Sequence, residues 1–206
     1  MKCAKFFART NADCVGGRVL AHWDDPPEEA VRRCEKEIVG FDKGERDFQF
    51  EGRKVPIGAN LAIKVSALGG EGAFVTTLGR TGTQLLGGEE VELLFRLMRR
   101  GRRVWYSAGA VVLHRMSGAR ARQAYYLKRE YWNGRCLAII DRRQNPLHYC
   151  HAKAWMRLFQ AALYLGPRLL WARITHDVRG ELLLECYRQY HVGYWSQTVG
   201  LPAMNG

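Results

Sequence analysis

A pair of glycines followed by a group of glutamates is the part of the sequence best suited to chemistry. Gly87 and Gly88 precede Glu89, Glu90 and Glu92. A glycine pair lets the backbone turn sharply and approach a ligand closely. Carboxylates on the first turn of a following helix would stand at the rim of an α/β sheet, where a general base accepts a proton from an incoming hydroxyl.

The same glutamates also suit the start of a helix for structural reasons alone. Apolar residues recur at helical spacing between residues 88 and 100, namely Val91, Leu94, Phe95 and Met98. Glutamates in the first turn, with Arg99 and Arg100 in the last, favour the helix dipole. The residues alone therefore leave two interpretations open, a catalytic carboxylate and a dipole-stabilised helix start.

A histidine at the end of the next β-rich region is the second candidate. The runs Val104–Tyr106 and Ala110–His114 predict two short strands divided by Ser107-Ala108-Gly109. His114 can present a ring nitrogen to a metal ion or a phosphate oxygen. A single histidine packed against a strand is the structural alternative.

The elements that must position these residues alternate between strands and helices, which predicts an α/β fold. Strands are expected at residues 15–20 and 61–65, and a long helix at residues 119–140. Glycines crowd residues 69–88, and so long a connection in a compact domain is often functional. The remaining expectations are a helix at 28–36, a surface loop at 40–54, helices at 152–165 and 180–191, and a helix break at Gly166-Pro167 with a helix resuming at 169–171.

Six segments stand in a fixed order along the chain: Val15-Gly-Gly-Arg-Val-Leu, Gly58-Ala-Asn-Leu-Ala-Ile, Gly70-x-x-x-Phe74, Leu78-Gly79-Arg80-x-Gly82, Gly87-Gly-Glu-Glu-x-Glu-Leu-x-x-Arg-Leu and Ala110-Val-Val-x-His114-Arg115. In this order and spacing they resemble the family 2 glycosyltransferases, over about residues 10–140. The resemblance implies a partial GT-A fold, in which a Rossmann-like mixed sheet with flanking helices precedes a helical C-terminal tail. It also implies inverting transfer of a sugar from a nucleotide-sugar donor to an acceptor hydroxyl, with Mg²⁺ or Mn²⁺ on the donor diphosphate. The acceptor would be a sugar or a lipid-linked molecule of the cell envelope.

Carried onto this chain residue by residue, the resemblance implies a role for eight positions. Glu90 would be the base that takes the proton of the acceptor hydroxyl, and Glu89 would bind the acceptor. His114 would reach toward the metal and the diphosphate. The positions that would border donor and acceptor are Gly58, Asn60, Arg80, Gly87 and Gly88.

Two departures from the family pattern change what is expected of the chain. The family carries Asp where this chain has Glu90; the extra methylene displaces the carboxylate by about 1.5 Å, and a misplacement of about 1 Å can cost on the order of 100-fold in rate. Family members also carry an apolar strand and an Asp-x-Asp metal motif before the Val15 segment, and neither occurs in the fourteen residues before Val15. The chain is therefore expected to correspond to the C-terminal half to two thirds of such an enzyme. We expect it to hold a divalent cation weakly and to have little or no activity alone.

The formal charge of +12 comes almost entirely from one stretch of the chain. Residues 96–143 contain thirteen Lys or Arg and two acids. A solvated face, a surface toward anionic lipid and a nucleic-acid site all fit this basicity. Aromatic residues between the arginines could stack bases, although no nucleic-acid-binding signature accompanies them, so nucleic acid is a disfavoured partner. These aromatic residues are Tyr125, Tyr126, Tyr131 and Trp132.

The C-terminal tail has the composition of an amphipathic helix at a membrane surface. It combines large aromatic residues with basic ones: Trp155, Phe159, Tyr164 and Trp171 with Lys153, Arg157, Arg168 and Arg173. We therefore expect two domains, an acceptor-side transferase portion at residues 1–145 and a helical membrane-surface tail at 146–206. A noncatalytic basic module that binds anionic lipid or RNA is the alternative function.

Cysteine usage and hydropathy indicate the compartment. The six cysteines form no Cys-x-x-Cys pair, and no window approaches 18 uncharged apolar residues. Scattered cysteines are typical of reduced thiols in the cytosol, and a chain crossing a bilayer needs a longer apolar run. The expected location is the cytoplasm, with peripheral association at the inner face of the membrane.

Overall fold

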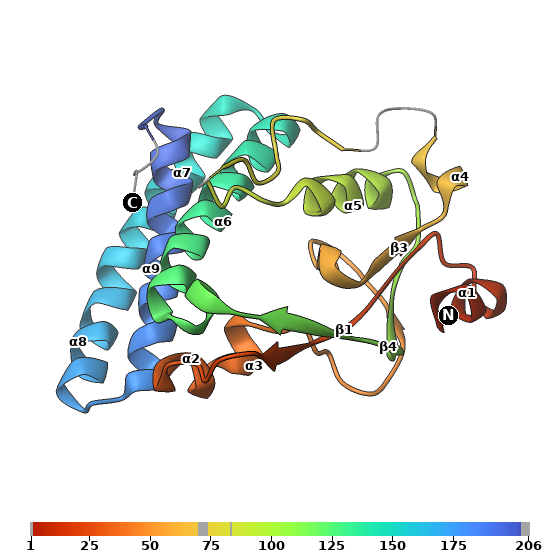
Figure 1. Cartoon of the computed structure of the whole chain (residues 1–206). Coiled ribbons are helices and arrows are strands. Elements are labelled where there is room, and N and C mark those ends of the chain that lie inside the picture. The colour runs from red at the N-terminus through yellow and green to blue at the C-terminus, as the bar shows by residue number, and fades with distance from the viewer. Residues whose placement is uncertain (1, 70–73, 83, 203–206) are drawn as a thin grey trace. The chain divides into compact units, whose positions relative to one another are not determined.

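The computed structural model describes residues 2–69, 74–82 and 84–202. These residues form two compact units, each assembled from separate stretches of the chain, and Figure 1 traces the elements in order. Unit 1 comprises Met1–Asp24, Glu35–Thr77 and Glu89–Met116. Unit 2 comprises Asp25–Cys34, Leu78–Gly88 and Ser117–Gly206.

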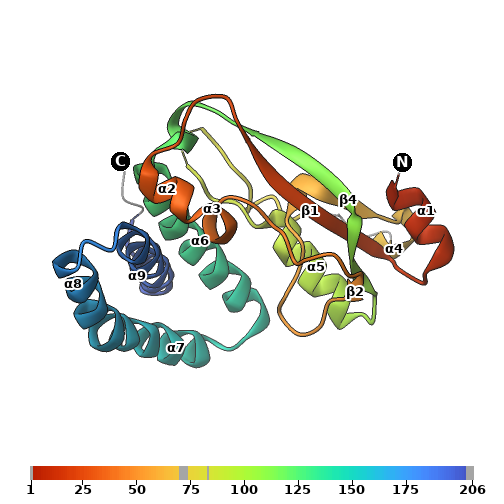
Figure 2. The same ribbon diagram turned by 90° about the horizontal axis from the view of Figure 1, so that it is seen from below.

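A four-stranded mixed sheet with the order β2-β4-β1-β3 forms the centre of unit 1. β1 (Cys14–Trp23) pairs in parallel with β4 (Val104–Met116), and Figure 2 shows the two strands side by side. β3 (Leu61–Ile63) pairs antiparallel with β1, and β2 (Phe48–Gln49) pairs antiparallel with β4. The expected α/β class and mixed sheet are confirmed.

Helices pack against both faces of this sheet. α5 (Glu89–Arg99) lies on one face, and the helix predicted at residues 88–100 is therefore confirmed. Val15 and Trp105 point to the other face, where they pack near Phe6 of α1 (Lys2–Arg9). This division follows from the alternation of side chains along a strand. The core on the α5 side consists of Cys14, Phe50, Leu93, Leu94, Leu97, Val104 and Tyr106.

β4 is one strand, whereas the sequence predicted two. Ser107 pairs with Gly17 and Val111 pairs with Arg18, so residues 108–110 have no partner in β1 and form a bulge. The carboxylate of Asp47 accepts a hydrogen bond from the backbone N–H of Ala108 at 2.8 Å. The strand continues through the bulge because this unpaired backbone still has a hydrogen-bond partner.

The shorter elements of the first half differ from prediction. The helix expected at residues 28–36 is divided into α2 (Glu29–Arg33) and α3 (Glu35–Ile38). The strand expected to reach Val65 ends at Ile63, and α4 (Val65–Leu68) follows. β2 lies within the expected loop at 40–54, and α1 was not predicted at all. Phe6 explains α1, because a single buried aromatic side chain ties this short helix to the sheet.

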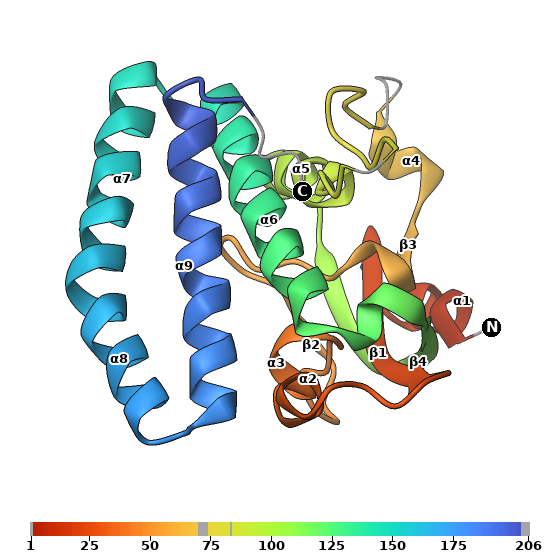
Figure 3. The ribbon, with the colours of Figure 1, turned by 60° about the vertical axis from the view of Figure 1, so that its left-hand side comes forward.

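Long helices make up most of unit 2. α6 (Gln123–Gln144) and α9 (Val178–Thr198) pack against each other, and α7 (Leu147–Gln160) and α8 (Gly166–Ile174) pack on the other side of α9. Figure 3 shows α9 between α6 and the α7–α8 pair. The helices expected at 119–140, 152–165 and 180–191 correspond to α6, α7 and α9.

Glycines allow α6 and α9 to approach closely. A Cβ atom at Gly134 would overlap the carbonyl oxygen of Tyr190, and one at Gly193 would overlap that of Tyr131. Small residues at such a crossing bring two helix backbones together. Because α6 packs on α9 in this way, it belongs to the same compact unit as the C-terminal helices, and the residue 145 boundary expected from sequence lies inside unit 2.

A buried ion pair connects the helices of unit 2. The carboxylate of Asp141, which is fully buried, accepts hydrogen bonds from Lys153 Nζ at 2.6 Å and from the Tyr194 hydroxyl at 2.9 Å. These residues come from α6, α7 and α9. A buried charge is tolerated when a countercharge and further hydrogen bonds satisfy it, and Asp141 has both.

The helix break predicted at Gly166-Pro167 is replaced by a π-helical segment, Ala161–Leu165, which joins α7 to α8. Pro167 lacks an N–H and would clash with the preceding turn of a regular α-helix. A wider π turn removes this clash and keeps the helix continuous. Within the described residues, no helix combines the length and the apolar character needed to cross a membrane.

Candidate active site

The glutamates at the start of α5 occupy three different environments. Glu92 is 3% exposed and pairs with Arg96, whose Nη2 lies 3.1 Å from Glu92 Oε2. Glu89 and Glu90 are only half-buried. The dipole interpretation treats all three carboxylates alike, whereas the structure assigns Glu92 to an internal ion pair and leaves the other two for different roles.

Glu90 lies over the backbone of Gly58. Its Oε1 accepts a hydrogen bond from the Gly58 N–H at 3.3 Å, and a Cβ atom at Gly58 would also stand 3.3 Å from the Glu90 side chain. Gly58 begins the 3-10 turn Gly58–Asn60. The absence of a side chain at Gly58 therefore lets the longer Glu90 side chain rest beside this turn.

Asn60 fixes the other end of the same turn to the sheet. Its Nδ2 donates hydrogen bonds to the carbonyl oxygens of Arg18 and Ala110, each at 2.9 Å. These carbonyls lie at the β4 bulge, where the regular pairing with β1 is interrupted. A Cβ atom at Gly17 would overlap both the Ala110 carbonyl and the Asn60 amide. The structure thus brings Gly58, Asn60 and Glu90 together on unit 1.

Glu89 has a carboxylate oxygen whose hydrogen-bonding capacity is unused. Its Oε2 is shielded from solvent and has no hydrogen-bond partner among the described residues. A shielded carboxylate oxygen without a donor is costly, so we expect a water molecule or a ligand to donate to it. A hydroxyl group of a bound molecule would supply the missing donor.

Gly87 and Gly88, expected to shape the loop, belong to unit 2 and differ from each other. Gly88 has a φ of +87°, and a Cβ atom there would overlap Cys136 Sγ of α6. This position therefore requires glycine both for its backbone conformation and for close packing. Gly87 has open space around it.

Within the described residues, neither Arg80 nor His114 has a hydrogen bond or an ion pair with Gly58 or Glu90. Arg80 is an exposed residue of unit 2 with no hydrogen bond or ion pair to another described residue. His114 pairs with Ala21 in β1, and four residues of strand, about 13 Å, separate it from Ala110. Gly70, the first residue of another of the six segments, lies outside the described residues.

The described residues do not by themselves fit a divalent metal ion. No group of three or more His, Cys, Asp or Glu side chains with suitable geometry occurs among residues 2–69, 74–82 and 84–202. Mg²⁺ and Mn²⁺ prefer several oxygen ligands, and His114 offers a single nitrogen. The role expected for His114 at a metal stays a prediction.

A polar cluster that the sequence did not indicate stabilises the loop after α3. Asp42 accepts hydrogen bonds from the Gly44 N–H at 2.9 Å, from Arg18 at 2.7 Å and from the Tyr106 hydroxyl at 3.3 Å. The hydrogen bond from the Gly44 N–H is the main cause that lowers the pKa of Asp42. Arg18 lowers this pKa further, and partial burial opposes both effects. Burial raises the pKa of Tyr106. The sequence Asp42-Lys43-Gly44 is typical of a side chain that closes its own turn, and this signal could have revealed the cluster.

The aromatic residues of the basic stretch are mostly part of the core. Tyr126, Tyr131 and Trp132 are at most 4% exposed. Buried rings offer no face on which a base can stack.

The arrangement on unit 1 can accept a proton and bind a hydroxyl. One carboxylate, Glu90, is held beside a backbone turn, and its neighbour Glu89 retains an unpaired oxygen. A carboxylate within hydrogen-bond reach of a hydroxyl is the minimum requirement for general-base catalysis. Comparisons with protein-family models, with curated proteins and with solved structures found no significant match to this chain.

Proposed function

We propose that this chain carries the acceptor-activating part of a glycosyltransferase that moves a sugar from a nucleotide-sugar donor to an acceptor hydroxyl. The observation that supports the proposal best is the pair of carboxylates at the start of α5. Glu90 is positioned by the Gly58 turn, and Glu89 Oε2 is shielded and unpaired. Purely structural carboxylates in the same protein, Glu92 and Asp141, are instead fully paired.

In the proposed reaction, the proton, the sugar and the leaving group each go to a defined acceptor. The acceptor hydroxyl gives its proton to a carboxylate oxygen of Glu90, while its oxygen forms a bond to the anomeric carbon of the sugar. The bond from that carbon to the donor diphosphate breaks, and its electron pair leaves with the diphosphate. Attack on the face opposite to the leaving group inverts the configuration. Glu89 accepts a hydrogen bond from a second acceptor hydroxyl and so orients the first.

Acceptor binding is the direct test, because the chain alone is expected to turn over donors slowly or not at all. Saturation-transfer NMR with a panel of sugars and a lipid-linked sugar should identify an acceptor that binds the wild-type chain. Glu89→Gln should weaken that binding about tenfold, the effect of losing one hydrogen bond to a charged group. Glu51→Gln is the matched control, since Glu51 is an exposed glutamate of the same unit.

A conservative variant tests the role of Glu90. Glu90→Asp withdraws the carboxylate from Gly58 by about 1.5 Å, and Glu90→Gln keeps the length but removes the base. If any donor in a nucleotide-sugar panel is turned over, Glu90→Gln should abolish release of the nucleotide diphosphate, and Glu90→Asp should reduce it on the order of 100-fold. A sugar affinity that is unchanged by substitution of Glu89 and of Glu90 would falsify the proposal.

A further inference from the structure

α7, the π-helical segment and α8 form a helical arm. The distribution of apolar side chains on this arm is the reverse of that on a helix exposed to water. Its buried positions are mostly small, and its large apolar side chains point outward. A helix at a protein surface normally buries the large residues and exposes polar ones. The buried side chains are Cys150, Ala154, Ala161, Ala172 and one large residue, Leu169. The exposed large ones are Leu147, Tyr149, Trp155, Met156, Phe159, Leu163, Tyr164, Leu170, Trp171 and Ile174.

Exposed large hydrophobic side chains are concentrated on this arm. Residues 147–174 hold ten of the sixteen large hydrophobic side chains that are exposed among the described residues. Three of them are more than 60% exposed: Phe159 (65%), Trp171 (67%) and Ile174 (63%). A concentration of this kind marks an interaction surface, whereas isolated exposed hydrophobics are normal. We call these ten residues the arm face.

The charges along the arm select its partner. Residues 147–174 contain Lys153, Arg157, Arg168 and Arg173 but no Asp or Glu. Lys153 is turned inward to Asp141, and Arg173 pairs with Glu181 and Glu185 of α9. Arg168 is exposed and has no ion pair with any residue of the described part of the chain. Arg157 lies over the rings of Tyr190 and Tyr194, so the charge that the arm presents to a partner comes mainly from Arg168. Because the arm carries no acid to oppose it, this charge favours an anionic partner over a second copy of the arm.

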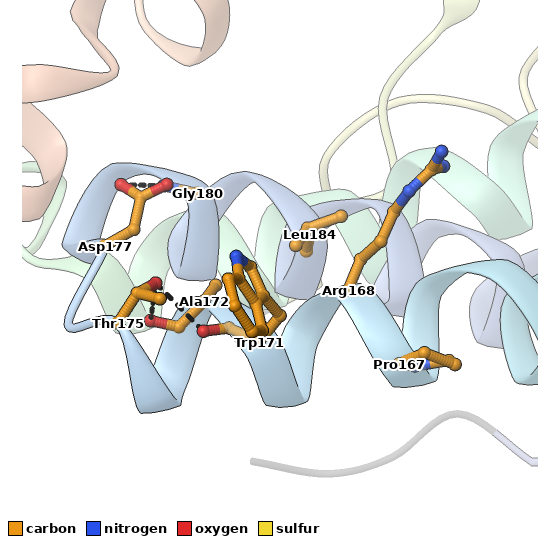
Figure 4. Close-up of a pocket in the computed structure, with 8 residues that line it drawn as sticks. All are labelled: Pro167, Arg168, Trp171, Ala172, Thr175, Asp177, Gly180 and Leu184. Carbon is orange, nitrogen blue, oxygen red and sulfur yellow. Dashed lines mark hydrogen bonds between the residues drawn. The ribbon is translucent and has the colours of Figure 1, made fainter.

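Arg168 and Trp171 also line one groove, which has a volume of about 510 Å³ and lies between α8 and the start of α9. Figure 4 shows both side chains projecting from the same side of α8. The acid in this groove, Asp177, is engaged with the backbone N–H of Gly180 at 2.9 Å. The groove thus offers a guanidinium beside an indole ring. The guanidinium suits a lipid phosphate, and the indole suits the interfacial region next to that phosphate.

We propose that the arm face binds the surface of a membrane containing anionic lipids, with α7 and α8 lying along the plane of that surface. Trp and Tyr are the side chains that favour the boundary between lipid headgroups and acyl chains. The arm face presents Trp155, Trp171, Tyr149 and Tyr164 there, with aliphatic side chains and Phe159 between them. Amphipathic helices bind such surfaces through buried apolar area together with attraction between basic residues and anionic headgroups.

The test is flotation of the full chain with vesicles of two compositions, phosphatidylcholine alone and equal parts phosphatidylcholine and phosphatidylglycerol. We expect binding to the anionic vesicles, weakened by added salt, with little binding to the neutral ones. Phe159→Ser and Trp171→Ser should each reduce the affinity about tenfold. Leu113→Ser is the matched control because Leu113 is 64% exposed on β4 of unit 1, outside the arm face.

A charge variant separates the electrostatic contribution from the apolar one. Arg168→Gln should weaken binding to anionic vesicles about fivefold, and Arg99→Gln, an exposed arginine of α5, should leave it unchanged. Equal binding to both vesicle types would overturn the choice of an anionic surface. Binding that the arm-face variants do not change would overturn the site itself.

Self-association is the competing explanation, and sedimentation of the chain without vesicles detects it. A dimer that dissociates in Phe159→Ser and Trp171→Ser would show that the arm face meets a second copy, and would overturn the membrane proposal. Thermal unfolding of each variant verifies that it is folded. None of these measurements depends on Glu89 or Glu90, so the transferase and membrane proposals can fail separately.

Discussion

The acidic groups of the two units are organised in opposite ways. In unit 2, Asp141 is fully buried and is satisfied by Lys153 and Tyr194 from two other helices. In unit 1, Glu89 and Glu90 are half-buried, one with a single long hydrogen bond and the other with an unpaired oxygen. A complete network stabilises a fold, and an incomplete one has hydrogen-bonding capacity left for water or a ligand.

Glu92 makes the difference clear because it lies on the same helix turn as Glu89 and Glu90. Its pairing with Arg96 resembles the pairing of Asp141 rather than the state of its neighbours. The helix dipole acts on all three glutamates, so it cannot explain why only one is satisfied internally. Position on the helix, and therefore what each side chain faces, separates structural carboxylates from candidate catalytic ones.

Removal of the countercharge in unit 2 should have the largest effect on stability. Lys153→Met leaves Asp141 buried without its Lys153 partner, and we expect a loss of about 3–5 kcal/mol in the free energy of unfolding. Urea unfolding measures this loss. The double variant Lys153→Met with Asp141→Asn removes both charges and should recover most of it. A loss below about 1 kcal/mol in the single variant would show that the pair is not buried as described.

The corresponding substitution in unit 1 disrupts a close backbone contact rather than an ion pair. Gly17→Ala inserts a methyl group that overlaps the Ala110 carbonyl and the Asn60 amide. We expect a loss of about 1–3 kcal/mol, together with weaker sugar binding because Asn60 holds the turn under Glu90. Gly87→Ala is the control, since that position has open space, and its stability should change by less than about 0.5 kcal/mol.

Elements with a strong local pattern could be predicted from the sequence. α5 has an apolar stripe, acids first and arginines last, and the structure confirms it at Glu89–Arg99. β4 was predicted as two strands because Ser107-Ala108-Gly109 has the composition of a turn. Asp47, distant in sequence, supplies the hydrogen bond that keeps this segment within one strand. Such a tertiary contact leaves no trace in the local pattern.

The candidate site shows the same limit. The positions Gly58, Asn60 and Glu90 were predicted together, and the structure places them in contact through Gly58 N–H and the Gly58–Asn60 turn. That Asn60 joins two carbonyls across a bulge could not be predicted, because the bulge was not. The inverted arm face was also hidden, since a list of apolar and basic residues does not say which of them point inward. Lys153 was predicted to be a basic surface residue, and the structure shows that it is the buried countercharge of Asp141.

Two substitutions in the first turn of α5 compare a paired carboxylate with one that has an unpaired oxygen. Glu92→Gln weakens the buried pair with Arg96, and we expect a loss of about 1–3 kcal/mol. Glu89→Gln removes a charge that has an unpaired oxygen, so the stability should stay within about 0.5 kcal/mol of wild type while sugar binding falls. Urea unfolding and NMR titration of the same samples give both quantities. Equal destabilisation by the two variants would contradict the separation of roles.

The smallest expected effect is a pH dependence at Asp42, a carboxylate of unit 1 that is well paired yet partly exposed. The Gly44 N–H is the main cause of its lowered pKa, with Arg18 contributing. A carboxylate whose pKa is lower in the folded state stabilises the protein above the usual Asp pKa of about 3.9, and this stabilisation disappears as the pH falls through the lowered value. Asp42→Asn should therefore have a lower urea midpoint than wild type at pH 7, by less than Glu92→Gln. The difference should shrink as the pH falls below about 3.9 and vanish once the pH is below the lowered pKa of Asp42. A difference that persisted there would show that Asp42 stabilises the loop through packing rather than charge.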